Sequence, residues 1–333
     1  MMSENYFDGN HSQTNNDNQT QSYDYPKLLL PEVVRFWLLM IFEVPSLTCS
    51  LILLYYLLID HDLRQSLSNH VIIVLLIIGL FSQLIDIPFY LNYLRINYVW
   101  PPITISCLIW WFAATGISNL TNIIMAWASI ERHILVFHDG LLSTKRKRIF
   151  FHYLPLLTIV LYGFIYYIMI LLMYTCENMY AYELDWCLYP CYYNNEDLAM
   201  YDTIINSIIP TPIIAIFSIA LIIRVIQQKS NHHRHFQWRR YRKMAIQLLS
   251  IAALFLLFNL PMTSLVLAHV CGLPDGSTGQ FELYTYYLYH FVSLLMPFVC
   301  LGSLPEIRKK MKQIIVFQTV VHTITPGLAR YAN

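Results

Sequence analysis

The sequence predicts an all-α membrane protein, built as a bundle of seven transmembrane helices with a short amphipathic eighth helix. Composition is the first reason: 57% of the 333 residues are hydrophobic and only 12% are charged, whereas about a quarter of an average soluble domain is charged. The second reason is that seven segments are apolar over about 20 or more residues, enough to cross about 30 Å of hydrocarbon as helices. The net charge of +1 gives no indication of a nucleic-acid partner.

The seven spans together define the bundle, residues 33–303. A helix satisfies its own backbone hydrogen bonds, which lipid cannot do, so each apolar run is expected to be helical. The spans are placed, to within a few residues, at 33–59, 70–94, 104–134, 152–175, 200–227, 243–270 and 283–303.

Residues 1–32 form a polar, acidic stretch rich in Asn and Gln, which we expect to be a disordered tail. The tail carries two N-x-Ser/Thr sequons, at Asn10 and Asn18. Such sequons are glycosylated only where they reach the secretory lumen.

The distribution of cations predicts the orientation of the bundle. With the N-terminus outside, 18 of the 21 Lys and Arg lie on the inner side, and only Lys27, Arg35 and Arg95 lie outside. Cytoplasmic loops are the ones that carry such an excess of positive charge. We therefore predict a multi-pass plasma-membrane protein with an extracellular N-terminus, glycosylated at Asn10 and Asn18.

Four cysteines lie at or beyond the predicted outer face, where disulfides form. They are Cys107, Cys176, Cys187 and Cys191. Four cysteines allow three pairings, of which we favour Cys107 with Cys191 and Cys176 with Cys187. The alternative is that one or two of the four remain free.

The third span ends on Glu131-Arg132-His133, and Arg132 follows Cys107 by 25 residues. At 1.5 Å per residue that is about 37 Å, which crosses the membrane. The same spacing separates the bridge cysteine from the arginine of the E/D-R-Y motif in rhodopsin-like G-protein-coupled receptors, and the sequence resembles that family over most of its length. Further matches are Trp100 in YVWPP, Pro210 in IIPTP, Phe255 and Pro261 in FLLFNLP, and Pro297 in MPFVC.

The resemblance implies a receptor that transmits binding of an extracellular ligand to heterotrimeric G proteins. A ligand would shift an equilibrium between a closed and an open inner face, with Pro261 weakening the sixth helix. Arg132 would pair with Glu131 at rest and reach the G protein afterwards. We assign coupling and activation to Glu131, Arg132, His133, Phe255, Pro261 and Pro297.

The sequence also departs from the family's pattern at helices two, six and seven. Gly79 stands where the family usually has a buried aspartate, Asn259 where it has a tryptophan, and Met296 and Cys300 replace the Asn and Tyr of N-P-x-x-Y. Tyr241 lies near where many members place an acid that locks the arginine. The resting state is then held less firmly, and we expect ligand-independent activity.

Ionisable groups inside a bilayer are costly and mark functional sites; here they are Glu43, Asp86 and His290, with Asp202 near the outer end of the fifth span. Asp86 and His290 lie about 10 to 12 Å deep on neighbouring helices. We hypothesise that they face one another and bind the ligand; a purely structural pair is the equal alternative. The candidate pocket comprises Asp86, Thr115, Asp202 and His290.

Two absences narrow the class of ligand. The seventh span has no lysine for a retinal Schiff base, and Ala114 stands where amine receptors have a counter-ion aspartate. The acidic second outer segment favours a cationic peptide.

Residues 304–317 are predicted to form the amphipathic eighth helix, with apolar residues at helical spacing and cations between them. Residues 318–333 then form a cytoplasmic tail. No HExxH or GxSxG motif occurs, so we predict no enzymatic activity, cofactor or metal site. Two alternatives stay open: a seven-span ligand-binding decoy without signalling, and a transporter or channel, although no internal repeat supports the latter.

Overall fold

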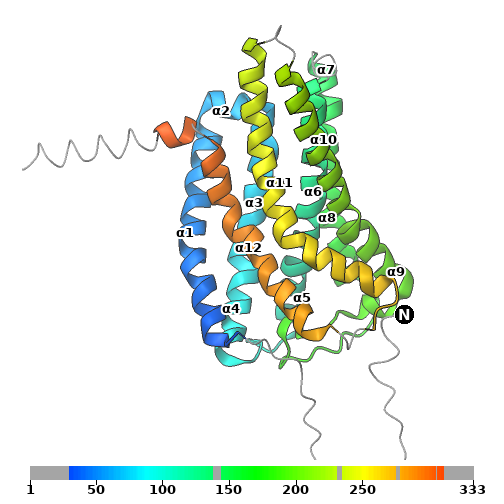
Figure 1. Ribbon diagram of the computed structural model, residues 1–333. Coiled ribbons are helices and arrows are strands. Elements are labelled where there is room, and N and C mark those ends of the chain that lie inside the picture. The colour runs from blue at the N-terminus through cyan, green and yellow to red at the C-terminus, as the bar shows by residue number, and fades with distance from the viewer. Residues whose placement is uncertain (1–29, 138–143, 231–234, 275–277, 305, 311–333) are drawn as a thin grey trace, which may run out of the picture.

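A computed structural model describes residues 30–137, 144–230, 235–274, 278–304 and 306–310, which are helical with connecting turns and contain no strand (Figure 1). Seven of the helical rods are long and apolar enough to cross a membrane, which confirms the predicted seven-helix fold. Their bounds are Glu32–Ile59, Asn69–Ile96, Thr104–Leu135, Lys145–Met173, Glu196–Gln227, Ala245–Val270 and Gly279–Ser303.

Three spans are single helices and four are stacks of helical segments. The first, sixth and seventh spans are α1 (Glu32–Ile59), α11 (His235–Val270) and α12 (Gly279–Ser303). The second span consists of α3 (Leu67–Phe81), η1 (Ser82–Asp86) and α4 (Ile87–Ile96), and the third of α5 (Thr104–Trp111), η2 (Phe112–Ile117) and α6 (Ser118–Phe137). The fourth comprises α7 (Lys145–Arg148), η4 (Ile149–Tyr153), α8 (Leu154–Ile168) and η5 (Met169–Met173), and the fifth α9 (Glu196–Tyr201), η8 (Asp202–Ile208) and α10 (Pro210–Ser230).

Three of the widened, π-helical segments lie just before a proline. The segments η1, η4 and η8 end two residues before Pro88, Pro155 and Pro210, respectively. Proline has no N–H and its ring crowds the preceding turn, and a single wider turn accommodates this without ending the helix. The sequence therefore explains why these spans bend locally instead of running straight.

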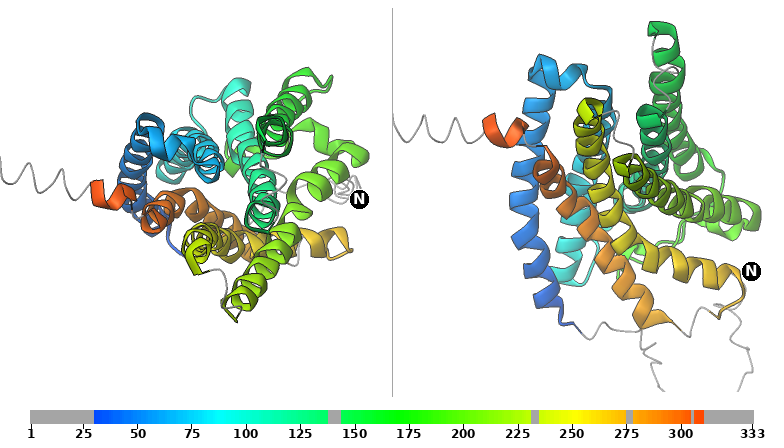
Figure 2. Two further views of the ribbon diagram at one scale, coloured as in Figure 1. Left: turned by 90° about the horizontal axis from the view of Figure 1, so that it is seen from above. Right: turned by 45° about the horizontal axis from the view of Figure 1, so that its top comes forward.

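The bundle has two chemically different ends. One end, which we call the disulfide end, carries α9, the start of α5 and the turns η6 (Asp185–Cys187) and η7 (Cys191–Asn194); it lies at the bottom of Figure 1. The other, the Arg132 end, carries α2 (His61–Gln65) and α7 at the top. The third span is the most buried of the seven, and it lies toward the middle of the bundle when viewed along its length (Figure 2).

Only the beginning of the predicted eighth helix is described. Residues 306–310 are helical and turn sideways from the end of α12 (Figure 1), and Lys310 forms an ion pair with Asp60 before α2. The rest of the predicted helix, the 318–333 tail and the 1–29 part of the N-terminal tail, with Asn10 and Asn18, lie outside the described residues.

Candidate ligand-binding and signalling sites

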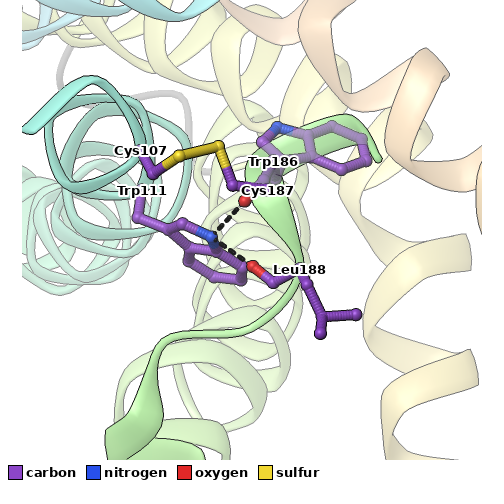
Figure 3. Close-up of a disulfide and its surroundings, with 5 residues drawn as sticks. All are labelled: Cys107, Trp111, Trp186, Cys187 and Leu188. Carbon is purple, nitrogen blue, oxygen red and sulfur yellow. Dashed lines mark hydrogen bonds between the residues drawn. A yellow bond between two sulfur atoms is a disulfide. The ribbon is translucent and has the colours of Figure 1, made fainter. Parts of the chain in front are cut away.

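The loop between the fourth and fifth spans is fixed to the third span at the disulfide end. Cys107 in α5 forms a disulfide with Cys187, and the Trp111 indole, one turn further on, donates to two loop carbonyls (Figure 3). Its Nε1 lies 2.5 Å from the Trp186 oxygen and 2.7 Å from the Leu188 oxygen. These contacts hold the loop backbone in place on both sides of Cys187, where residues 186–188 all have positive φ, a conformation costly for residues other than glycine.

The four outer cysteines do form two bridges, but the pairing favoured from the sequence is wrong. The bridges are Cys107–Cys187 and Cys176–Cys191. The anchored turn places Cys187 against Cys107, whereas the Cys191 amide bonds to the Asn178 side chain at 2.8 Å and so lies in the part of the loop that contains Cys176. Topology alone put all four residues on one side and left the pairing undecided.

The loop also contains an acid with a perturbed pKa. Burial raises the pKa of Asp185 to about 6, opposed by a backbone hydrogen bond and by the Arg35 charge. Arg35 in turn donates to the Tyr90 hydroxyl at 3.1 Å. Electrostatic interactions thus connect the loop, α1 and α4 at the disulfide end of the bundle.

Asp86 and His290 lie together, deeper in the same end. His290 Nε2 is 3.5 Å from Asp86 Oδ2, and Trp110 Nε1 donates to the other carboxylate oxygen at 2.9 Å. The Tyr90 ring stacks on the imidazole, with centroids 4.7 Å apart. Both ionisable side chains are 4% exposed, so the pair is a buried polar centre contributed by three helices.

Glu43 belongs to the same depth of the bundle, although the sequence did not assign it to the pocket. About one turn further from the disulfide end, Gln83 Nε2 donates to Ser46 Oγ at 2.6 Å and to the Ser293 carbonyl at 2.8 Å. Glu43 lies three residues from Ser46, Asp86 three from Gln83 and His290 three from Ser293, which is close to one helical turn in each case. In all three helices this step leads toward the disulfide end. Glu43 is 5% exposed, and neither of its carboxylate oxygens has a hydrogen-bond partner among the described residues.

The structure gives Asp202 separate partners. Its Oδ1 accepts from the Tyr167 hydroxyl at 2.7 Å and from Asn206 Nδ2 at 2.8 Å, and its Oδ2 accepts from the Tyr192 hydroxyl at 2.9 Å. These contacts tie the loop to the fourth and fifth spans and occupy both oxygens. Thr115 lies half-buried in η2; no contact between it and the Asp86–His290 pair is resolved.

At the Arg132 end, the Glu131 carboxylate has a partner from the fourth span. His152 Nδ1 in η4 bonds to Glu131 Oε1, and the Glu131 charge also interacts electrostatically with its neighbour Arg132. Arg132 is 1% exposed, and the half-buried His133 packs edge-on against Phe217 at 5.9 Å. The sequence indicated no partner for Glu131 from the fourth span, because a histidine near a helix end, such as His152, is not a distinctive signal.

Two of the departures from the family's pattern, Gly79 and Met296, contact one another in the core. A Cβ added at Gly79 would lie 2.8 Å from Met296 Cε, so methionine fills the space that glycine leaves. Asn259 Nδ2 donates to Asn122 Oδ1 at 3.2 Å and to Thr211 Oγ1 at 3.1 Å. Phe255, fully buried, lies one turn from Asn259 in α11, and Pro261 and Pro297 lie inside α11 and α12.

Comparisons with known proteins agree with this architecture. The family model of the 7 transmembrane receptor (rhodopsin family) matches residues 49–323. The crystal structure of squid rhodopsin is similar, with a TM-score of 0.66 and 15% identity over 86% of this chain and 87% of that one. No curated protein matches the sequence. From its match over most of its length, the chain belongs to the rhodopsin family of seven-transmembrane receptors, which are not enzymes.

Proposed function

We propose that this receptor transmits the binding of an extracellular ligand with a basic group, such as a cationic peptide, to a heterotrimeric G protein. In this proposal the disulfide end and the N-terminus face the outside of the plasma membrane. The Arg132 end faces the cytoplasm.

The observation that carries the proposal is the buried acidic centre at the disulfide end. Asp86 lies beside the His290 imidazole, Glu43 is close enough to Asp86 for their charges to interact, and Glu43 has no hydrogen-bond partner among the described residues. A buried carboxylate is costly unless a cation or a hydrogen-bond donor accompanies it. A basic group of the ligand would supply the missing donor, and the acidic residues of the outer loop would attract it.

The Arg132 end supplies the features needed for coupling. Arg132 is buried beside Glu131 in the third span, and prolines lie inside both α11 and α12. Proline weakens a helix locally, so these helices are suited to a change of angle at the inner face. A ligand shifts that equilibrium only by its difference in affinity for the two states.

The test is a screen of a library rich in basic peptides on cells that express the receptor with a promiscuous G protein. A peptide should stimulate nucleotide exchange, and Arg132→Ala should abolish the stimulation while surface expression and peptide binding persist. Stimulation that survives in Arg132→Ala would contradict the coupling role.

A ligand-binding decoy is the second candidate, because Gly79 and Met296 fill the core where the family has polar groups. Binding and uptake of a peptide without exchange by any G protein would favour the decoy. Ion flux on expression would instead favour a channel.

A further inference from the structure

The loop between the fourth and fifth spans inserts one of its side chains between the helices at the disulfide end. The Trp186 ring stacks on Tyr90, with centroids 5.6 Å apart, and on the His290 imidazole at 6.4 Å. It also contacts the rings of Tyr286 at 5.1 Å and Trp110 at 6.0 Å. Aromatic rings attract one another at these separations. The four rings, which come from the second, third and seventh spans, form a space that we call the indole slot, and Trp186 fills it.

Trp186 also interacts with the acid of the buried centre. The Asp86 carboxylate interacts with the indole of Trp186 as well as with that of Trp110. The polar group of an indole is its N–H, which donates and cannot accept. Trp110 and His290 belong to spans, whereas Trp186 belongs to the loop turn η6. A buried carboxylate needs donors, and here the loop supplies the kind of donor that a ligand would supply.

The backbone of the loop has a costly conformation where it presents this side chain. Trp186, Cys187 and Leu188 have φ values of 52°, 58° and 70°, which are unfavourable for residues other than glycine. The bridge from Cys107 and the two bonds from Trp111 hold the turn, and the Trp186 ring points away from Trp111 (Figure 3). Backbone strain of this kind concentrates at functional sites. The loop therefore keeps a strained turn that places the indole in the slot.

The indole slot is accessible from the disulfide end. Trp110, Tyr90 and His290 are 0%, 2% and 4% exposed, whereas Trp186 is half-buried. The side chain that fills the slot thus comes from the surface and keeps part of its residue in contact with solvent. A group of similar shape can take its place from outside when the loop side chain leaves.

We propose that the indole slot is a binding subsite for a planar aromatic group that carries an N–H donor, and that the loop's own Trp186 occupies it when no such ligand is bound. The surrounding rings select a flat aromatic group, and Asp86 selects the donor. As a site for the receptor's ligand, the slot rests on the proposed function, because it adjoins the acidic centre assigned there to a basic group. The ligand is then a basic molecule with an indole-like ring close to its cation.

The experiment replaces the loop side chain by free indole. Trp186→Gly removes the ring, and glycine adopts a positive φ without steric cost, so the variant should fold with the slot empty. Thermal unfolding of the purified receptor in nanodiscs is measured over a series of indole concentrations. Indole should raise the unfolding temperature of Trp186→Gly by several degrees and then saturate, because it binds the folded state. The wild type, whose slot is filled, should not shift.

Two controls separate the slot from non-specific partitioning of indole. Benzofuran has the shape of indole but an oxygen in place of the N–H, so it cannot donate to Asp86 and should stabilise Trp186→Gly less. Trp100→Gly removes a tryptophan that is 64% exposed at the same end and should not respond to indole. The proposal is overturned by an absent effect of indole on Trp186→Gly, by an equal effect of benzofuran, or by an equal effect of indole on Trp100→Gly.

A second measurement keeps the test decisive if Trp186→Gly does not fold unaided. Cells that express the variant are then grown with indole or with benzofuran, and the surface yield of the receptor is measured. Indole should restore the yield because it stabilises the folded state, and benzofuran should restore less of it. A yield that indole leaves unchanged would count against the subsite as strongly as an unchanged unfolding temperature.

Signalling distinguishes the subsite from the proposed function. A Trp-containing peptide of the basic library that activates the receptor should be at least tenfold more potent on Trp186→Gly, because it no longer has to displace the loop side chain. A peptide that activates wild type and Trp186→Gly equally would support the proposed function and exclude the slot from its binding. If indole acts as described and no peptide activates any G protein, the subsite stands and the proposed function fails.

Discussion

At the scale of single residues, the ionisable side chains inside the bundle divide into two kinds. Asp202 is surrounded by donors from Tyr167, Tyr192 and Asn206, so both oxygens already have partners. Asp86 interacts with the indoles of Trp110 and Trp186 and with the His290 imidazole, and Glu43 has no hydrogen-bond partner among the described residues. We propose that the first kind stabilises the fold and that the second is available to a ligand.

Asp86→Asn tests this distinction. The change removes the negative charge but keeps an oxygen that can accept from Trp110, so the fold should survive. We expect the potency of an activating basic peptide to fall tenfold or more, which corresponds to at least about 1.4 kcal/mol. Dose–response curves at matched surface expression measure the effect. Asp197→Asn, an exposed acid of α9, is the control; equal potency in wild type and Asp86→Asn would exclude the binding role.

At the scale of elements, three of the widened turns each contain a buried ionisable side chain. Asp86 ends η1, His152 lies in η4 and Asp202 begins η8. Each segment is followed by a proline within a few residues, so one sequence feature both deforms the helix and lies next to the buried polar group. Such turns often occur at functional sites in helices.

Close approach of two helices is a second element-scale feature. A Cβ added at Gly163 in α8 would lie 2.6 Å from Leu120 Cδ1 and 3.2 Å from Leu120 Cβ, and Leu120 is itself buried. The glycine therefore allows α8 and the third span to pack directly.

Gly163→Ala should lower the free energy of unfolding by about 1–3 kcal/mol, because overpacking forces either helix or side chain to move. Thermal unfolding in nanodiscs measures the loss. Gly302→Ala, where an added Cβ meets nothing within 4 Å, should be close to neutral. Equal effects at the two glycines would show that helix contact is not the cause.

At the scale of the whole molecule, the disulfide end and the Arg132 end carry separate buried polar centres, joined by helices whose cores are mainly apolar. Asp86 and His290 occupy one end. The hydrogen bonds that run from Glu131 through His152 and His70 to the Arg64 carbonyl occupy the other. The polar contacts of Asn259, Asn122 and Thr211 link three helices between them. We expect a change at one end to reach the other through movement of the helices that these contacts link.

The orientation of the molecule has a direct test. If the disulfide end faces outside, Asn10→Gln and Asn18→Gln should each reduce the apparent mass of the glycosylated receptor by one glycan, and an N-terminal epitope should be detected on intact cells. Detection of that epitope only after permeabilisation would reverse the proposed orientation and place the acidic centre on the cytoplasmic side.

The sequence by itself determined the class of fold, because the number of apolar runs and the bilayer thickness leave little choice. It also singled out Asp86 and His290 as candidates, because charge inside a membrane is costly wherever it occurs, and Arg132 by its spacing from Cys107. The sequence did not predict the contacts between distant segments. The cysteine pairing, the Glu131–His152 bond and the placement of Glu43 beside the pocket depend on how helices rotate and how one loop turns. Only the tertiary structure decided them, because many side-chain pairings are compatible with one set of spans and packing selects among them.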